Sequence, residues 1–190
     1  MNEEDLLKKI ERFADAAHGA QTRKYTNDRY IVHPIRVMNL CEHYNNDIAV
    51  LAAALLHDVL EDTAVTRDEL FTFLKMQMDT KTANSTIKLV EELTDIYTKN
   101  NFPSLNRKVR KALEAQRLSL VSSDAQTIKY ADIIDNSDLV TADPDFATVY
   151  LREASILLEI MQKGNNDLRD KAIQRITECK RILKRIKFSQ

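Results

Sequence analysis

Four ionisable side chains, His57, Asp58, Glu61 and Asp62, follow directly after an apolar run at residues 48–56. Residues four apart share a face of a helix, so Glu61 is expected one turn beyond His57. Asp62 has the same relation to Asp58. The C-terminal end of a helix disfavours negative charge by about 0.3–1 kcal/mol per group, so this cluster breaks a local rule, which is typical of a site. A divalent cation would relieve the repulsion among these carboxylates.

Two further residues complete a candidate cation site with His57 and Asp58, namely His33 and Asp132. Two imidazoles and two carboxylates form a mixed nitrogen and oxygen set, which suits Mn²⁺, Fe²⁺ or Zn²⁺ better than Ca²⁺ or Mg²⁺. Taken alone, each residue has a simpler interpretation than a metal ligand. His33 could be a residue at the start of a helix, because it precedes Pro34. Asp132 could be a polar group with hydrogen-bond partners on a partly buried helix. The ligands come from three expected helices, so the fold must assemble the site.

The chain has only two glycines and three prolines in 190 residues, which disfavours folds with many tight turns. Apolar residues recur with a helical period over most of the sequence. We therefore predict an all-α fold of about eight or nine helices in a single domain over residues 1–190.

Local signals place the expected helices. Pro34 suits a first helical position and puts His33 at the mouth of its helix, Thr66 and Glu69 form a capping box, and Asp143 precedes a helix that starts at Pro144. Asp124 is expected to cap a further helix. The expected helices include residues 3–18, 47–60, 84–97, 106–121 and 144–161, and a basic helix after the stop signal at 164–166.

Net charge, cysteine spacing and apolar stretches in the sequence indicate which binding partners and which cellular compartment to expect. The chain has 28 basic and 29 acidic residues, so it has no net attraction to nucleic acid or to an anionic membrane. Cys41 and Cys179 match no zinc or redox spacing, which is typical of reduced thiols in a cytoplasmic protein. The N-terminus lacks the apolar core of a signal peptide, and no stretch approaches the ~20 apolar residues of a membrane span.

Segments at residues 17–24, 30–37, 52–63, 91–94 and 128–136 resemble, in order, the HD-domain metal-dependent phosphohydrolases. Within that family the chain is similar to the hydrolase domain of RelA/SpoT-type proteins and to small stand-alone alarmone hydrolases. The resemblance implies an HD-domain helical bundle and the metal ligands His33, His57, Asp58 and Asp132. It implies that the acidic pair that acts in catalysis is Glu61 and Asp62. It implies that the substrate-binding residues are Arg23, Lys24 and Asn136.

The implied activity is that of a guanosine 3′,5′-bis(diphosphate) 3′-pyrophosphohydrolase, which removes a 3′-diphosphate from a guanine nucleotide by metal-activated water. Mn²⁺ is the first expectation for the cofactor, with Fe²⁺ or Zn²⁺ as alternatives. The partner is then a small-molecule nucleotide rather than a nucleic acid or a membrane, and the oligomeric state stays open. Two alternatives remain: hydrolysis of another nucleotide or phosphorylated metabolite, and a nucleotide-binding module without catalysis.

The chain departs from the family pattern around the expected phosphate contacts. Ile133 stands where a basic residue commonly follows the aspartate, and the basic residue expected near Phe146 is missing, although Arg152 follows. Ala20 replaces a glycine before Gln21. The basic run at residues 107–111 is interpreted as a solvated helix face, with the border of a pocket as the alternative. These differences concern the choice of substrate more than hydrolysis itself.

Overall fold

The computed structural model describes residues 2–137, 140 and 142–188. Within these residues the chain forms ten helices, of which α4 is a single turn, and its only β-structure is an isolated bridge between Thr22 and Arg29. The all-α prediction is confirmed. Two compact units divide the chain, residues 1–94 and 95–190. That they make up a single domain stays a prediction.

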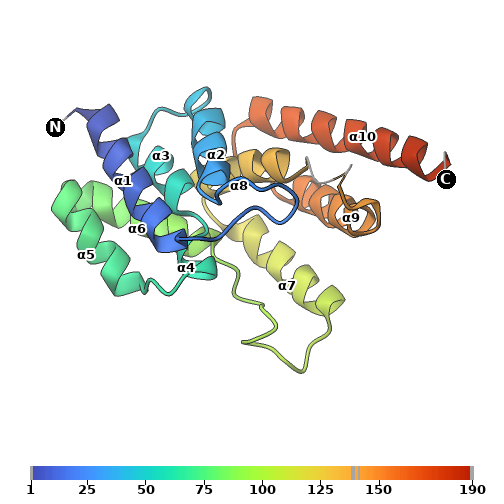
Figure 1. The fold of residues 1–190 in the computed structure, drawn as a ribbon, viewed down its shortest axis with the longest axis horizontal. Helices are drawn as coiled ribbons and strands as arrows, with labels where there is room; N and C mark the ends of the chain where they lie inside the picture. The colour runs from blue at the N-terminus through green and yellow to red at the C-terminus, as the bar shows by residue number, and fades with distance from the viewer. Residues whose placement is uncertain (1, 138–139, 141, 189–190) are drawn as a thin grey trace. The chain divides into compact units, whose positions relative to one another are not determined.

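The first unit is organised around one short apolar helix. Its helices are α1 (Glu3–His18), α2 (Val32–Glu42), α3 (Ile48–Leu56), α4 (Val59–Asp62), α5 (Arg67–Gln77) and α6 (Thr80–Leu93). In Figure 1, α3 lies among its neighbours α1, α2 and α6, and it packs against all three. Every residue from Ala49 to Leu56 is buried, as expected of a helix that is apolar on all sides. This helix carries His57 and Asp58 at its end.

Side-chain caps set where several of these helices begin. The Asn2 side chain accepts a hydrogen bond from the Asp5 amide at 2.7 Å at the start of α1. At α5, the capping box predicted for Thr66 and Glu69 is present in both directions. Such caps satisfy amide groups that have no partner inside the helix and are each worth about 1 kcal/mol.

The second unit contains α7 (Arg107–Leu120), α8 (Ser123–Asn136), α9 (Pro144–Ile160) and α10 (Asn166–Phe188). The long helix α10 packs against α8 and α9, and α9 also packs against α7. Asp143 caps α9 through the Phe146 amide, with Pro144 in its first turn, as predicted. No helix among the described residues combines the length and apolar character that a membrane span requires.

Gly164 allows the α9–α10 connection to approach α8 closely. An added Cβ at this position would lie 2.5 Å from Tyr130 Cε2 and 2.9 Å from the Thr127 amide nitrogen. On either side of it, the Lys163 amide donates to Gln126 Oε1 at 2.8 Å and the Asn165 amide to Thr127 Oγ1 at 2.9 Å. The glycine predicted as a stop signal is therefore required by packing against a helix backbone.

Replacing Gly164 with alanine should lower the free energy of unfolding by about 1–3 kcal/mol, because the added methyl group overpacks against α8. Urea denaturation of the purified variant measures this loss. Gln174→Ala, on the exposed side of α10, should stay within about 0.5 kcal/mol of wild type. A Gly164→Ala protein as stable as the control would contradict the close approach.

Candidate metal centre

The apolar helix α3 ends at Leu56, earlier than predicted, and a turn at His57 and Asp58 separates it from α4. The expected continuous helix to residue 60 is therefore wrong. The predicted one-turn spacing of Asp58 and Asp62 is nevertheless present, because the Asp62 amide donates to the Asp58 carbonyl at 2.8 Å. Asp62 thus stays one turn beyond Asp58.

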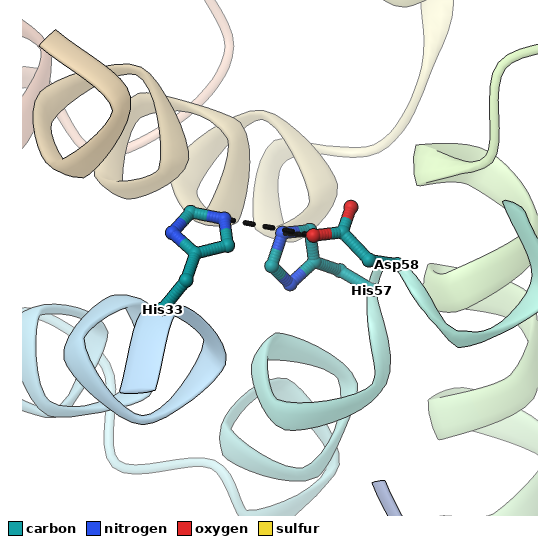
Figure 2. A group of neighbouring side chains, drawn as sticks. All are labelled: His33, His57 and Asp58. Atoms are coloured by element: carbon teal, nitrogen blue, oxygen red, sulfur yellow. Dashed lines mark ion pairs between the residues drawn. The ribbon is translucent and has the colours of Figure 1, made fainter. Parts of the chain in front are cut away.

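His33 lies inside the first turn of α2, which begins at Val32 rather than at Pro34 as predicted. The following proline is tolerated there because the first amide groups of a helix have no intrahelical partner. His33 is only 1% exposed. Figure 2 shows it projecting from α2 towards His57 and Asp58 at the end of α3.

Three ligand atoms, one from each of His33, His57 and Asp58, lie within 4.8 Å of one another. The Asp58 Oδ2 atom is 3.1 Å from His57 Nε2 and 3.5 Å from His33 Nε2. With metal–ligand distances of about 2.0–2.2 Å, ligand atoms around one ion lie roughly 3.0–3.5 Å apart. The two distances from Asp58 Oδ2 therefore fit ligand atoms around a single divalent cation.

The tautomer of His57 also fits metal binding. Its Nδ1 atom lies 2.8 Å from the Ala54 carbonyl oxygen, which can only accept a hydrogen bond. Nδ1 therefore carries a proton, which leaves Nε2, 3.1 Å from Asp58 Oδ2, as the nitrogen that could bind a metal ion. A backbone carbonyl that fixes the ring of a ligating histidine in this way is a common support of metal sites.

Tyr30 joins this cluster to the predicted catalytic pair. Its hydroxyl group lies 2.7 Å from Asp58 Oδ2 and 3.0 Å from Asp62 Oδ2. Burial, and then the charge of Asp58, raises the pKa of Tyr30 far above its ordinary value, so the phenol keeps its proton. Burial and the charge of Asp58 also raise the pKa of Asp62. Glu61, on the same turn as Asp62, is exposed.

The predicted nucleotide-binding pair, Arg23 and Lys24, lies in the connection between α1 and α2. The Arg23 guanidinium is 5.8 Å from the centre of the Tyr30 ring, which brings it to the edge of the cluster. Lys24 is exposed and lies over the ring of Tyr25, 4.8 Å from its centre. Arg23 is therefore the member of the pair that the first unit brings near the predicted ligands.

The other two predicted site residues, Asp132 and Asn136, lie one turn apart on α8 in the second unit. The Asn136 side chain donates to Asp132 Oδ1 at 2.5 Å, and Lys129 Nζ is 2.8 Å from Asp132 Oδ2. All three line a cavity of about 730 Å³ within this unit. The role of Asp132 as a metal ligand stays a prediction.

Basic residues of α7 contribute to the same cavity. Arg107, Lys108 and Lys111 line it, as the alternative interpretation of this run as the border of a pocket expects, and Arg107 and Lys108 are also exposed. Arg107 makes two hydrogen bonds with Glu153, at 3.2 and 2.7 Å, and Lys111 lies 2.7 Å from Asp95.

Two of the positions that depart from the family pattern, Ile133 and Phe146, lie in or beside this cavity. Ile133 lines it, as does Arg152, and the ring of Phe146 lies 5.9 Å from the guanidinium carbon of Arg107, which also lines it. Ala20, the third altered position, lies in the first unit.

Sequence reasoning assigned no role to Tyr30 or to Lys129. The spacing of Lys129 three residues before Asp132 is a signal for an ion pair on one helix face. Tyr30 carries no comparable signal, because its partners lie 28 and 32 residues away in the chain.

Comparison with known proteins finds similarity to HD-domain proteins. The sequence profile of the family described as HD domain matches residues 11–149. Human guanosine-3′,5′-bis(diphosphate) 3′-pyrophosphohydrolase MESH1 is 37% identical over 137 residues, which is 70% of this chain and 69% of the human protein. The protein of the same name from Xenopus tropicalis is 34% identical over 74% of this chain and 73% of its own length.

Longer proteins and a solved structure show the same similarity. GTP pyrophosphokinase rsh of Brucella ovis is 32% identical over 70% of this chain, which corresponds to only 16% of the Brucella protein. The solved structure of a metazoan orthologue of SpoT that hydrolyses ppGpp has a TM-score of 0.71 and 26% sequence identity. The match covers 91% of this chain and 94% of that one. The profile and these relatives together show that the chain belongs to the HD domain family.

Proposed function

We propose that this protein is a metal-dependent phosphohydrolase that removes the 3′-diphosphate from guanosine 3′,5′-bis(diphosphate), releasing pyrophosphate. The observation that carries the proposal is the buried convergence of His33, His57 and Asp58, with Asp62 one turn beyond. The names of the human and Xenopus relatives supply the choice of substrate. The fourth metal ligand in this proposal is Asp132, which rests on the sequence resemblance alone.

The ligand chemistry favours Mn²⁺, with Fe²⁺ and Zn²⁺ as alternatives, because imidazole and carboxylate are both present. A divalent cation at such a site lowers the pKa of water bound to it and polarises a phosphoryl oxygen.

The chain itself positions the ligands and supplies carboxylates for proton transfer. The Ala54 carbonyl orients His57, and the Tyr30 hydroxyl holds Asp62 beside Asp58. Asp62, with Glu61 next to it, is placed to accept a proton from the attacking water or to protonate the 3′-oxygen when its bond to phosphorus breaks. General acid–base help of this kind contributes about 10²–10⁴-fold to a rate.

We assign substrate binding to Arg23, Lys24 and Asn136. Arg23 provides a planar cation that can stack on a base or bind phosphate oxygens. Asn136 lines a cavity of about 730 Å³, within the usual range for small-molecule sites, and Tyr150 adds an aromatic wall to it. A nucleotide is therefore a suitable occupant, and we propose no nucleic acid or membrane partner.

We also propose a cytoplasmic location. Cys41 and Cys179 are both buried, and neither forms a disulfide. Cysteines that form no disulfide are the usual condition in a reducing compartment.

Purified protein assayed with Mn²⁺ should release pyrophosphate from guanosine 3′,5′-bis(diphosphate) and much less product from GTP or a simple phosphomonoester. His57→Ala should abolish turnover and lower the bound metal, measured by elemental analysis, because a buried ligand is lost. His43→Ala, at the exposed end of α2, serves as the matched control and should retain both. If the protein instead released inorganic phosphate from another substrate faster than pyrophosphate from guanosine 3′,5′-bis(diphosphate), the result would favour a phosphohydrolase of different specificity.

Replacing the acidic pair by Glu61→Gln together with Asp62→Asn should preserve metal content and lower kcat by about 10²–10⁴-fold, because the proton-transferring carboxylates become amides. Steady-state kinetics at saturating Mn²⁺ measures the loss. Asp68→Asn, an exposed carboxylate on α5, is the control. An unchanged kcat in the double variant would remove the catalytic role of the pair.

Arg23→Ala should raise KM by about tenfold while kcat changes much less, because a cation that binds substrate in the ground state is removed. Arg29→Ala provides the comparison, since Arg29 lies in the same connection but pairs with Asp15 at 2.7 Å. If both variants keep the wild-type KM, the nucleotide is not bound by Arg23.

A further inference from the structure

One hydroxyl group lies between the predicted metal site and the predicted proton-transfer site. Tyr30 OH is 2.7 Å from Asp58 Oδ2 and 3.0 Å from Asp62 Oδ2. The same Asp58 oxygen lies 3.1 Å from His57 Nε2 and 3.5 Å from His33 Nε2. Tyr30 thus contacts one carboxylate from each of the two parts of the site.

The bonding capacity of this hydroxyl group limits how the carboxylates can lie. A phenol has one proton to donate and can also accept a hydrogen bond. A hydrogen bond from Tyr30 occupies one lone pair of Asp58 Oδ2 and leaves the other lone pair of that oxygen for a cation shared with the two imidazoles. The bond therefore fixes the rotation of the Asp58 carboxylate, which is otherwise a broad torsion.

The ring of Tyr30 is held by its neighbours. His18 stacks on it with ring centres 4.4 Å apart and planes inclined by 29°, and His33 meets it edge-on at 6.0 Å. His18 is itself fixed, because it is 7% exposed and its Nδ1 atom lies 2.9 Å from Gln21 Oε1. The backbone of Tyr30 is also anchored, since its amide donates to the Gln21 carbonyl at 3.0 Å.

We propose that Tyr30 is a positioning residue of this enzyme. Its hydroxyl group orients Asp58 towards the cation and holds Asp62 at a fixed place one helical turn away. It does so without touching the reacting atoms, so it acts through these two carboxylates. The effect on turnover rests on the proposed hydrolase function, whereas the effect on metal affinity does not.

The test is Tyr30→Phe, which removes one oxygen atom and leaves the ring between His18 and His33. Groups that support metal ligands typically contribute 10–100-fold to metal affinity or activity. Calorimetric titration of the metal-free full chain with Mn²⁺ should therefore show a Kd about tenfold higher than wild type. With guanosine 3′,5′-bis(diphosphate), kcat should fall by at least about tenfold, while KM stays within about threefold.

A double-variant comparison separates positioning from a general structural effect. If Tyr30 acts on catalysis through Asp62, adding Tyr30→Phe to Asp62→Asn should lower kcat little further at saturating Mn²⁺. Tyr44→Phe is the matched control. Tyr44 follows the C-terminal end of α2, whereas His33 lies in its first turn, and the helix rises about 1.5 Å per residue between them. This control should leave Mn²⁺ affinity and kcat unchanged.

Unchanged Mn²⁺ affinity and unchanged kcat in Tyr30→Phe would overturn the proposal. If the fold losses in kcat of the two single variants, Tyr30→Phe and Asp62→Asn, multiply in the double variant, the link to Asp62 is overturned. Should wild-type protein fail to hydrolyse the nucleotide, the proposed function fails, and the Mn²⁺ titration still decides whether Tyr30 orients Asp58.

Discussion

Two imidazole nitrogens and one carboxylate oxygen converge in the interior of the first unit, and the rest of that unit is arranged around them. His33 and His57 are 1% and 3% exposed, so their lone pairs are largely removed from water. Burying a polar group without compensation costs roughly 2–7 kcal/mol, depending on the reference state. A divalent cation bound by these atoms, which lie 3.1–3.5 Å apart, would offset that cost. The fold therefore builds a site with a strong preference for a cation.

Such a site requires rigid support, and the local structure supplies it in two ways. The buried helix α3 fixes the position of His57, and the Ala54 carbonyl fixes the orientation of its ring. The turn at His57 and Asp58 then redirects the chain, so that α4 presents Asp62 to Tyr30. A straight helix through these residues would keep the same spacing along one face but would not set the Asp58 backbone at φ −97° and ψ −7°.

Local signals in the sequence were sufficient for much of the fold. The capping box at Thr66 and the Asp143–Pro144 helix start are confirmed, because a cap involves residues only three positions apart. The helix expected at residues 84–97 instead spans Thr80–Leu93, capped by Asp79. Its first turn is polar and has no apolar period, so the pattern alone could not place its start.

The site could be predicted only in part, because local patterns in the sequence reveal some of its residues and long-range contacts bring in the others. His57 and Asp58 stand out because charged groups follow an apolar helix. The break at the end of α3 has no such signal, because a helix that is buried on every side shows no periodicity that a turn could interrupt. Tyr30 reaches the site through a contact 28 residues away, which depends on tertiary packing. Long-range contacts of this kind are what the single sequence does not determine.

The charges that line the cavity of the second unit bear on what it can recognise. Its described lining contains five basic and four acidic side chains, and Arg107, Lys111 and Lys129 each lie within 4 Å of an acidic partner. Near-balanced charge gives little attraction for a bare polyphosphate, whereas Ile133, Tyr150 and Leu157 offer apolar surface. This wall is better suited to a nucleoside, whose base is planar and whose polar edges can bond to an amide such as that of Asn136. The departures from the family pattern at Ile133 and Phe146 therefore place apolar side chains in and beside this cavity.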